Sequence, residues 1–305
     1  MLLSVVAPIY FAQNSVEVLV KLIVSECSLL QMDFEIILIE DGSTDNTWEK
    51  IEVLSSDIPQ LRGIKLSRNF GQHYAIACGI EQAKGDWIIV MDGDLQDHPS
   101  AIKQLLAKAN EGYDIVVAKR ISRQTSFLNK IYSIIFWKIL SYLTGRPLHH
   151  SISNFGIYHR RVIDAIISMR DAIRFFPTMV DWVGFKKTTI DMPQQARHEG
   201  KSTYSFNKMI RLALDVVLVN SEKPLRLVTK TGIFISIISF VVGIIYLYKH
   251  LTHQIEVPGY ASIIISIWFL GGLIICILGI LGLYIGKTFD AVKNRPYYII
   301  EKTTR

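Results

Sequence analysis

Two aspartates one residue apart, Asp92 and Asp94, carry the strongest chemical signal in this sequence, with Gly93 between them. They follow the apolar run 88–91, which is typical of a buried strand in a parallel sheet. Open α/β sheets bind their ligands in the loops at such strand ends. Because Mg²⁺ usually takes one or two protein carboxylates together with substrate phosphates, the pattern indicates metal-assisted handling of a diphosphate. A polar turn after a core strand is the alternative interpretation.

The elements that would position these aspartates alternate between strand and helix patterns. We expect strands at residues 3–10, 35–40, 63–66, 88–91 and 115–118, and helices at 15–30, 48–54 and between Gly71 and Ala83. This alternation predicts right-handed βαβ units and an α/β fold with a mainly parallel sheet. Because Asp41, Arg68 and the Asp92–Asp94 pair each follow a strand, we expect them to converge on one edge of the sheet.

The charge and cysteine content of the chain indicate which kinds of partner and compartment to expect. The chain has 305 residues and a net charge of +6, and half of it is hydrophobic. The basic balance favours anionic partners such as nucleotides, phosphates or an anionic membrane surface. We do not expect nucleic acid as a partner, because the sequence has no dense Lys/Arg helix and no known nucleic-acid motif. The three cysteines are widely separated, which fits a reducing compartment.

The C-terminal third is strongly apolar. Residues 231–248 and 261–285 contain no charged residue and are long enough for two spanning helices. Basic residues flank the pair on both sides: Lys223, Arg226 and Lys230 before it, and Lys287, Lys293, Arg295, Lys302 and Arg305 after it. We expect a multi-pass protein of the cytoplasmic (inner) membrane, in contact with membrane lipids. The positive-inside rule predicts that both ends of the pair, and with them the N-terminal domain, lie in the cytoplasm. Glycines between 271 and 286 permit close helix contact, within the hairpin or in a homo-oligomer.

Two further stretches are amphipathic. Residues 123–147 combine basic and aromatic side chains, as at a membrane interface, although a pair of core helices would show the same pattern. Residues 206–219 are expected to form an amphipathic helix that ends before Pro224. Either segment would place a lipid-facing surface next to the catalytic domain.

Four motifs in order resemble glycosyltransferase family 2: EDGSTDNT, LSRNFGQHYAIACGI, GDWIIVMDGDLQDHP and RHEGKSTYSF. The resemblance covers nearly the whole chain. It is strongest to the polyprenyl-phosphate glycosyltransferases, which include dolichol-phosphate mannose synthases and bactoprenol glucosyltransferases. It implies a Rossmann-like GT-A fold, a nucleotide-sugar donor, Mg²⁺ or Mn²⁺ as cofactor, and polyprenyl phosphate as acceptor.

The same resemblance implies a set of site residues. Asp92 and Asp94 would bind the metal and, with Arg197, act in catalysis. The implied nucleotide-sugar site comprises Pro8, Tyr10, Asp41, Arg68, Asp92, Gly93, Asp94, Gln96, Arg197, Ser202 and Tyr204. In this set Asp41 matches the acid that contacts base and ribose. Taken alone, Asp41 could be an Asx-turn residue and Arg68 a solvated cation.

The sequence departs from the family at two places. Asn154 and Gly156 flank Phe155 where relatives commonly have an acid and an arginine, so the acid that would serve as a base is missing. His149, His150 and Asp181 are candidate substitutes. Residues 11–13 read Phe-Ala-Gln where relatives often have Asn and Glu.

From these patterns we expect a catalytic domain at 1–205, a juxtamembrane helix and linker at 206–226, a transmembrane hairpin at 227–288 and a cytoplasmic tail at 289–305. The expected enzyme is a hexosyltransferase that moves a sugar from a nucleotide-sugar, with UDP-sugar favoured, to polyprenyl (undecaprenyl) phosphate with inversion. Two alternatives stay open. One is addition of a sugar to a lipid-linked glycan, and the other is a catalytically silent scaffold.

Overall fold

The computed structural model describes residues 1–121, 142, 152–169, 175–193, 223–252, 259–293 and 295–304. The chain forms two compact units. The first contains Met1–Ile134, His149–Ser205 and Arg295–Arg305, and the second contains Ile135–Leu148 and Phe206–Asn294. Residues after the second apolar helix therefore rejoin the first unit. The domain limits expected from the sequence stay predictions.

The first unit is built on an eight-stranded sheet with the order β7-β5-β6-β4-β1-β2-β3-β8. Its strands are β1 (Leu2–Ile9), β2 (Asp33–Glu40), β3 (Leu61–Leu66), β4 (Trp87–Val90), β5 (Ile115–Ile121), β6 (Ile152–His159), β7 (Lys187–Pro193) and β8 (Ile300–Thr303). β1 pairs in parallel with β2 and β4, β2 with β3, and β5 with β7. Only the pairings of β6 and β8 are antiparallel among the described strands. The predicted mainly parallel sheet is thus confirmed, as a mixed sheet.

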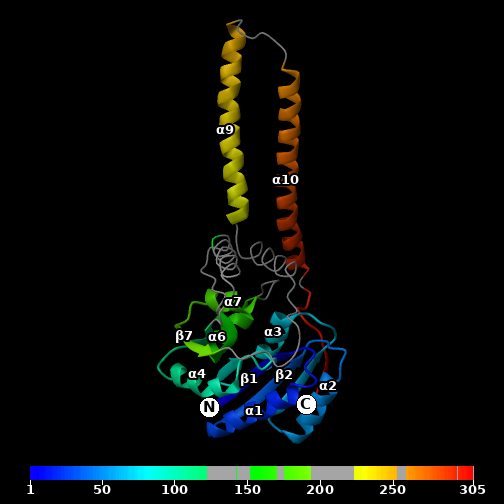
Figure 1. Cartoon of the computed structure of the whole chain (residues 1–305), viewed down its shortest axis with the longest axis vertical. Helices are drawn as coiled ribbons and strands as arrows, with labels where there is room; N and C mark the ends of the chain where they lie inside the picture. Colours follow the sequence, from blue (N-terminus) through cyan, green and yellow to red (C-terminus); the bar gives the residue numbers. More distant parts are fainter. Residues whose placement is uncertain are drawn as a thin grey trace. The chain divides into compact units, whose positions relative to one another are not determined.

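Helices cover both faces of this sheet (Figure 1). They are α1 (Val16–Leu29), α2 (Thr47–Asp57), α3 (Gln72–Gln82), α4 (Ile102–Ala109), α6 (Arg160–Ser168) and α7 (Phe176–Trp182), with a short 3₁₀ turn at Pro99–Ala101. The apolar residues of α1, α2 and α4 belong to one buried cluster, and those of α3, α6 and α7 to a second. Apolar residues at helical spacing, such as Leu19, Val20 and Ile23 in α1, form these contacts. The result is a three-layer α/β/α domain.

The second unit contains two long helices, α9 (Lys223–Leu251) and α10 (Tyr260–Val292). Within them, Leu225–Val242 and Ser266–Val292 are long and apolar enough to cross a membrane, and neither stretch is buried by the rest of the protein. A soluble protein would bury such surface in its core. The sequence placed the two spans at 231–248 and 261–285, which lie inside these helices.

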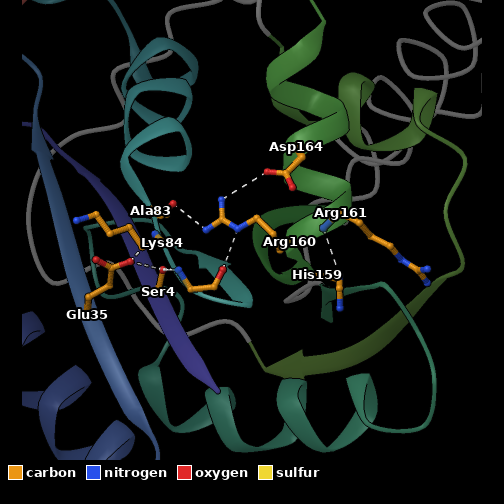
Figure 2. A network of polar contacts seen from close by, with 9 residues as sticks. Ser4, Glu35, Ala83, Lys84, His159, Arg160, Arg161 and Asp164 are labelled. Atoms are coloured by element: carbon orange, nitrogen blue, oxygen red, sulfur yellow. Dashed lines mark hydrogen bonds and ion pairs between the residues drawn. The ribbon is translucent and has the colours of Figure 1, made fainter.

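A polar network fixes the amino ends of the central strands (Figure 2). Ser4 Oγ donates to Glu35 Oε1 at 2.6 Å and accepts from the backbone N–H of Gly85 at 2.7 Å. Arg160, at the start of α6, donates from Nε to the carbonyl of Gly85 at 2.9 Å and from Nη2 to that of Ala83 at 2.7 Å. Both carbonyls belong to buried residues just before β4. The network therefore holds the start of β4, the strand that leads to Asp92.

We expect Arg160→Met to destabilise the fold by about 1.5–3 kcal/mol, because two buried carbonyls would lose charge-assisted hydrogen bonds. Chemical unfolding of the detergent-solubilised protein measures this. Asp164→Asn is the matched control: it removes only an ion pair of 3.7 Å to Arg160, with an Asp164 side chain that is 60% exposed. Its effect should stay within about 0.5 kcal/mol. Equal effects of the two variants would contradict this role of Arg160.

Candidate active site

The carboxyl ends of β1, β2, β3 and β4 lie side by side, because β1 pairs with both β2 and β4 and β2 pairs with β3. The described members of the predicted donor site lie at these ends: Pro8, Tyr10, Asp41, Arg68, Asp92, Gly93, Asp94 and Gln96. The geometry thus gathers them on one edge, while their binding roles stay predictions. Arg197, Ser202 and Tyr204, like His149 and His150, fall outside the described residues.

Asp41 joins two loops of this edge. Its carboxylate accepts backbone N–H groups of Phe70, at 2.8 Å to Oδ1, and of Gly71, at 2.9 Å to Oδ2. Burial is the largest cause that raises the pKa of Asp41, and the neighbouring Glu40 also raises it. The two N–H groups and Arg68 lower the pKa, and the net result is about 6. Ionising Asp41 in the folded protein is therefore costly, so its contribution to stability falls as pH rises from about 4 to about 6. A buried carboxylate with a raised pKa at the end of a strand is typical of a functional site.

The loop after β2 packs tightly on the loop after β3. Gly42 has φ +68°, and a Cβ there would lie 2.3 Å from the carbonyl carbon of Arg68 and 2.4 Å from the nitrogen of Asn69. Only glycine meets both the conformation and the space. The exposed Arg68 guanidinium lies over the ring of Phe70, 4.2 Å from its centroid. Asp41 and Gly42 together set the position of this cation.

Gln72, in the first turn of α3, orients the first metal-motif aspartate. Its Nε2 donates to Asp92 Oδ1 at 2.6 Å. Asp94 Oδ1 accepts the backbone N–H of Gln96 at 3.2 Å, and between these two Leu95 takes a left-handed conformation with φ +60°. A buried leucine with positive φ is strained. This loop is held in an unusual shape that presents two partly exposed carboxylates.

The donor set fits a hard divalent cation. Asp92 and Asp94 supply carboxylate oxygens, and Gly93 lets the loop approach β1, since a Cβ there would lie 2.8 Å from the carbonyl oxygen of Pro8. Among the described residues, no group of three or more His, Cys, Asp or Glu could hold a metal. The described residues alone therefore do not form a complete metal site. Asp92 and Asp94 suit a Mg²⁺ or Mn²⁺ ion whose other ligands come from a diphosphate and water.

Asn154 lies near the start of β6, which runs antiparallel to β4, so it stands beside the end of the strand that leads to Asp92. Its backbone carbonyl accepts the hydroxyl of Tyr158 at 3.2 Å. Asp181, a candidate substitute for the missing acid, is bound by Lys187, 2.5 Å from Nζ to Oδ1. The Asp181 oxygen that contacts Lys187 is thus occupied by an ion pair within the protein.

Sequence reasoning missed two residues of this edge. Gln72 stands in the quoted motif LSRNFGQH, and a polar residue at a helix start after a strand end was the available signal. Phe11 is 49% exposed and has φ +49°, its N–H donates to Ser43 Oγ at 3.0 Å, and its ring meets that of Tyr10 edge to face at 4.5 Å. No sequence pattern revealed the strain at Phe11.

Comparison with known proteins identifies the family. The model of "Glycosyl transferase family 2" matches residues 4–167. The chain belongs to this family. A glycosyltransferase of Synechocystis sp. is 33% identical over 299 residues, which cover 98% of this chain and 94% of the relative. The undecaprenyl-phosphate 4-deoxy-4-formamido-L-arabinose transferase of Proteus mirabilis is 32% identical over 302 residues, 98% of this chain and 93% of that one. The expected likeness to polyprenyl-phosphate glycosyltransferases is confirmed.

The fold of this family 2 glycosyltransferase is also confirmed. Glucosyl-3-phosphoglycerate synthase from Mycobacterium tuberculosis aligns with a TM-score of 0.51 at 16% identity, over 71% of this chain and 76% of that one. At this identity the likeness concerns the fold alone. The α/β unit is the predicted GT-A domain.

We predict that Phe11→Asn makes the glycosyltransferase more stable, by up to about 1 kcal/mol, because asparagine tolerates the left-handed region better than phenylalanine. Donor affinity should fall at the same time, since strain of this kind persists at functional sites. Thermal unfolding and the KM for the donor measure the two effects.

Gln31→Asn is the matched control, because Gln31 has φ +52° after α1 and lies before β2, away from the carboxyl edge. It should raise stability and leave donor KM unchanged. If Phe11→Asn behaves identically, the strain at Phe11 has no role in donor binding.

Proposed function

We propose that this glycosyltransferase moves one sugar from a nucleotide-sugar, with a UDP-sugar expected, to polyprenyl phosphate at the cytoplasmic face of a membrane. Undecaprenyl phosphate is the expected acceptor, and inversion the expected outcome. The observation that carries the proposal is the likeness to undecaprenyl-phosphate transferases of Proteus mirabilis and Photorhabdus laumondii, each 32% identical over 98% of this chain. So long an alignment includes both apolar helices.

The donor side of the proposal rests on the shared carboxyl edge. The mycobacterial synthase with the same fold was crystallised with Mn²⁺ and UDP. In this chain a Mg²⁺ or Mn²⁺ held by Asp92 and Asp94 would supply positive charge against the leaving diphosphate. Gln72 orients Asp92, Asp41 holds the loop after β3, and Arg68 adds a second positive charge on the same edge.

The membrane side rests on the two apolar helices and on connectivity. Residues before α9 and residues after α10 build a single sheet, since β8 pairs with β3. The chain therefore leaves the α/β unit before α9 and returns to it after α10. This supports a hairpin whose two ends lie on the same side of the bilayer. The basic residues near both ends favour the cytoplasmic side.

The acceptor explains the missing acid. An alcohol must lose a proton as it attacks, so it needs a positioned base. A phosphate monoester has its second pKa near about 6 and is largely dianionic at neutral pH, so it needs none. Asn154 then does not impair the reaction, and a neutral amide repels the dianion less than a carboxylate would.

We expect Asp94→Asn to reduce sugar transfer by at least about 100-fold, because an amide is nearly isosteric with a carboxylate but does not neutralise a divalent cation. Folding should be preserved. Asp33→Asn, at an exposed aspartate where β2 begins, is the control and should keep full activity. Turnover with Mg²⁺ or Mn²⁺, together with the melting temperature, tests this. Wild-type turnover of Asp94→Asn with the same metal requirement would refute the metal site.

The purified protein should glycosylate undecaprenyl phosphate and refuse undecaprenol when offered a panel of nucleotide-sugars. The panel also identifies the sugar and the nucleotide. Transfer to an alcohol or to a lipid-linked glycan, with none to the lipid phosphate, would favour the glycan-extending alternative. No transfer to any of these acceptors would favour the silent scaffold.

The rate constant kcat/KM for the lipid phosphate should fall below about pH 6 as the phosphate is protonated. The pKa of Asp41, which burial raises to about 6, lies in the same range. Binding of the intact nucleotide-sugar without acceptor separates the two, because its diphosphate is esterified at both ends and has no pKa of about 6, so a change of affinity in this range would come from the protein.

A further inference from the structure

The chain after the second apolar helix returns to the donor edge. α10 ends at Val292, and β8 then adds an antiparallel strand to β3, with Ile64 opposite Thr303 and Leu66 opposite Ile300. The pairing continues beyond β8, since the N–H of Thr304 donates to the carbonyl of Gly63 at 3.0 Å. Residues 299–304 are thus fixed along β3 from Gly63 onward, in the part of the strand that leads to Arg68.

The contact closest to the donor site is a backbone hydrogen bond. The N–H of Ser67, the residue before Arg68, donates to the carbonyl of Ile299 at 2.9 Å. The register of the pair shifts between Lys65 and Leu66. Irregularities of this kind bend a strand and redirect the side chains that follow. The loop 67–71 is therefore held by Asp41 at its end and by Ile299 at its beginning.

A side chain anchors this segment to the core. The Tyr298 hydroxyl donates to Glu81 Oε2 of α3 at 2.5 Å. The rings of Tyr298 and Phe70 both pack against the buried cluster that contains Leu66, Ile76 and Cys78. Since the Arg68 guanidinium lies over the ring of Phe70, Tyr298 and Arg68 are supported by the same cluster.

We propose that residues 295–304 are a positioning element of the donor site: they fix Ser67 and the loop that carries Arg68 and Phe70, so that nucleotide affinity depends on chain beyond the second apolar helix. This inference rests on the proposed donor site. Simple protection of a sheet edge is the alternative. Edge protection predicts a loss of stability on disruption, but no change in nucleotide affinity while the protein stays folded.

The test uses the full-length protein in detergent with Mn²⁺, and titration calorimetry with whichever of UDP, GDP and CDP the wild type binds most tightly. Tyr298→Phe keeps the ring and removes the bond to Glu81. It should weaken nucleotide binding about three- to tenfold, the effect of one lost hydrogen bond, at a temperature where the variant is fully folded. Glu301→Gln, in the same strand with a 42% exposed side chain, is the control and should bind like the wild type.

Removal of residues 295–305 should weaken binding further, and a synthetic peptide of these residues should restore it. Arg68→Met distinguishes a failure of the positioning role of residues 295–304 from a failure of the proposed donor site. If Arg68→Met weakens binding while Tyr298→Phe and the truncation do not, the positioning role is overturned and the donor site stands. If Arg68→Met has no effect, or no nucleotide binds the wild type, the proposed donor site fails and this inference with it.

Discussion

The donor edge depends on one buried carboxylate. Asp41 follows β2, yet both its oxygens are occupied by backbone N–H groups of the next loop, those of Phe70 and Gly71. Two parallel strands can end side by side without their loops being fixed, since strand pairing stops where the strands stop. The Asp41 carboxylate fixes the loop after β3 as well. Its raised pKa shows that keeping it ionised in the folded protein costs free energy. Without this carboxylate, the end of the loop that carries Arg68 would lose the two hydrogen bonds that hold it.

The loop with the predicted metal motif, Asp92 to Asp94, is also held by contacts with neighbouring elements. Gly93 brings it against the carbonyl of Pro8, and Gln72 reaches it from α3. α3 begins directly after the loop that Asp41 binds. Asp41 therefore supports the metal motif indirectly, because it fixes the start of the helix from which Gln72 projects. The two halves of the donor edge form a single connected structure.

The sequence predicted those parts of the fold that local pattern determines. Each of the first five strands contains a mainly apolar run, and each appears in the structure close to its expected place. β6 was missed because Asn154 and Gly156 interrupt its apolar character, and β8 because all four of its residues are exposed. β8 exists through pairing with β3, more than 200 positions earlier in the chain, and no local pattern reports such a partner. For the same reason the motifs located Asp41 and Arg68 but did not reveal the hydrogen bonds that hold the loop around Arg68. These bonds come from the Asp41 side chain and from the carbonyl of Ile299.

The loop that carries Arg68 is linked through the chain to the two apolar helices. Loops are the mobile parts of α/β folds, and binding sites built on them need external support to keep their geometry. Here the support at Ser67 comes from a segment that follows α10 directly. Because residues 299–304 follow α9 and α10 in the chain, the loop at Ser67 has this support only in a protein that contains both helices. A catalytic domain that ends before α9 would keep Asp41, Asp92 and Asp94. It would lose β8 and the hydrogen bond from Ser67 to Ile299 that holds the start of the loop.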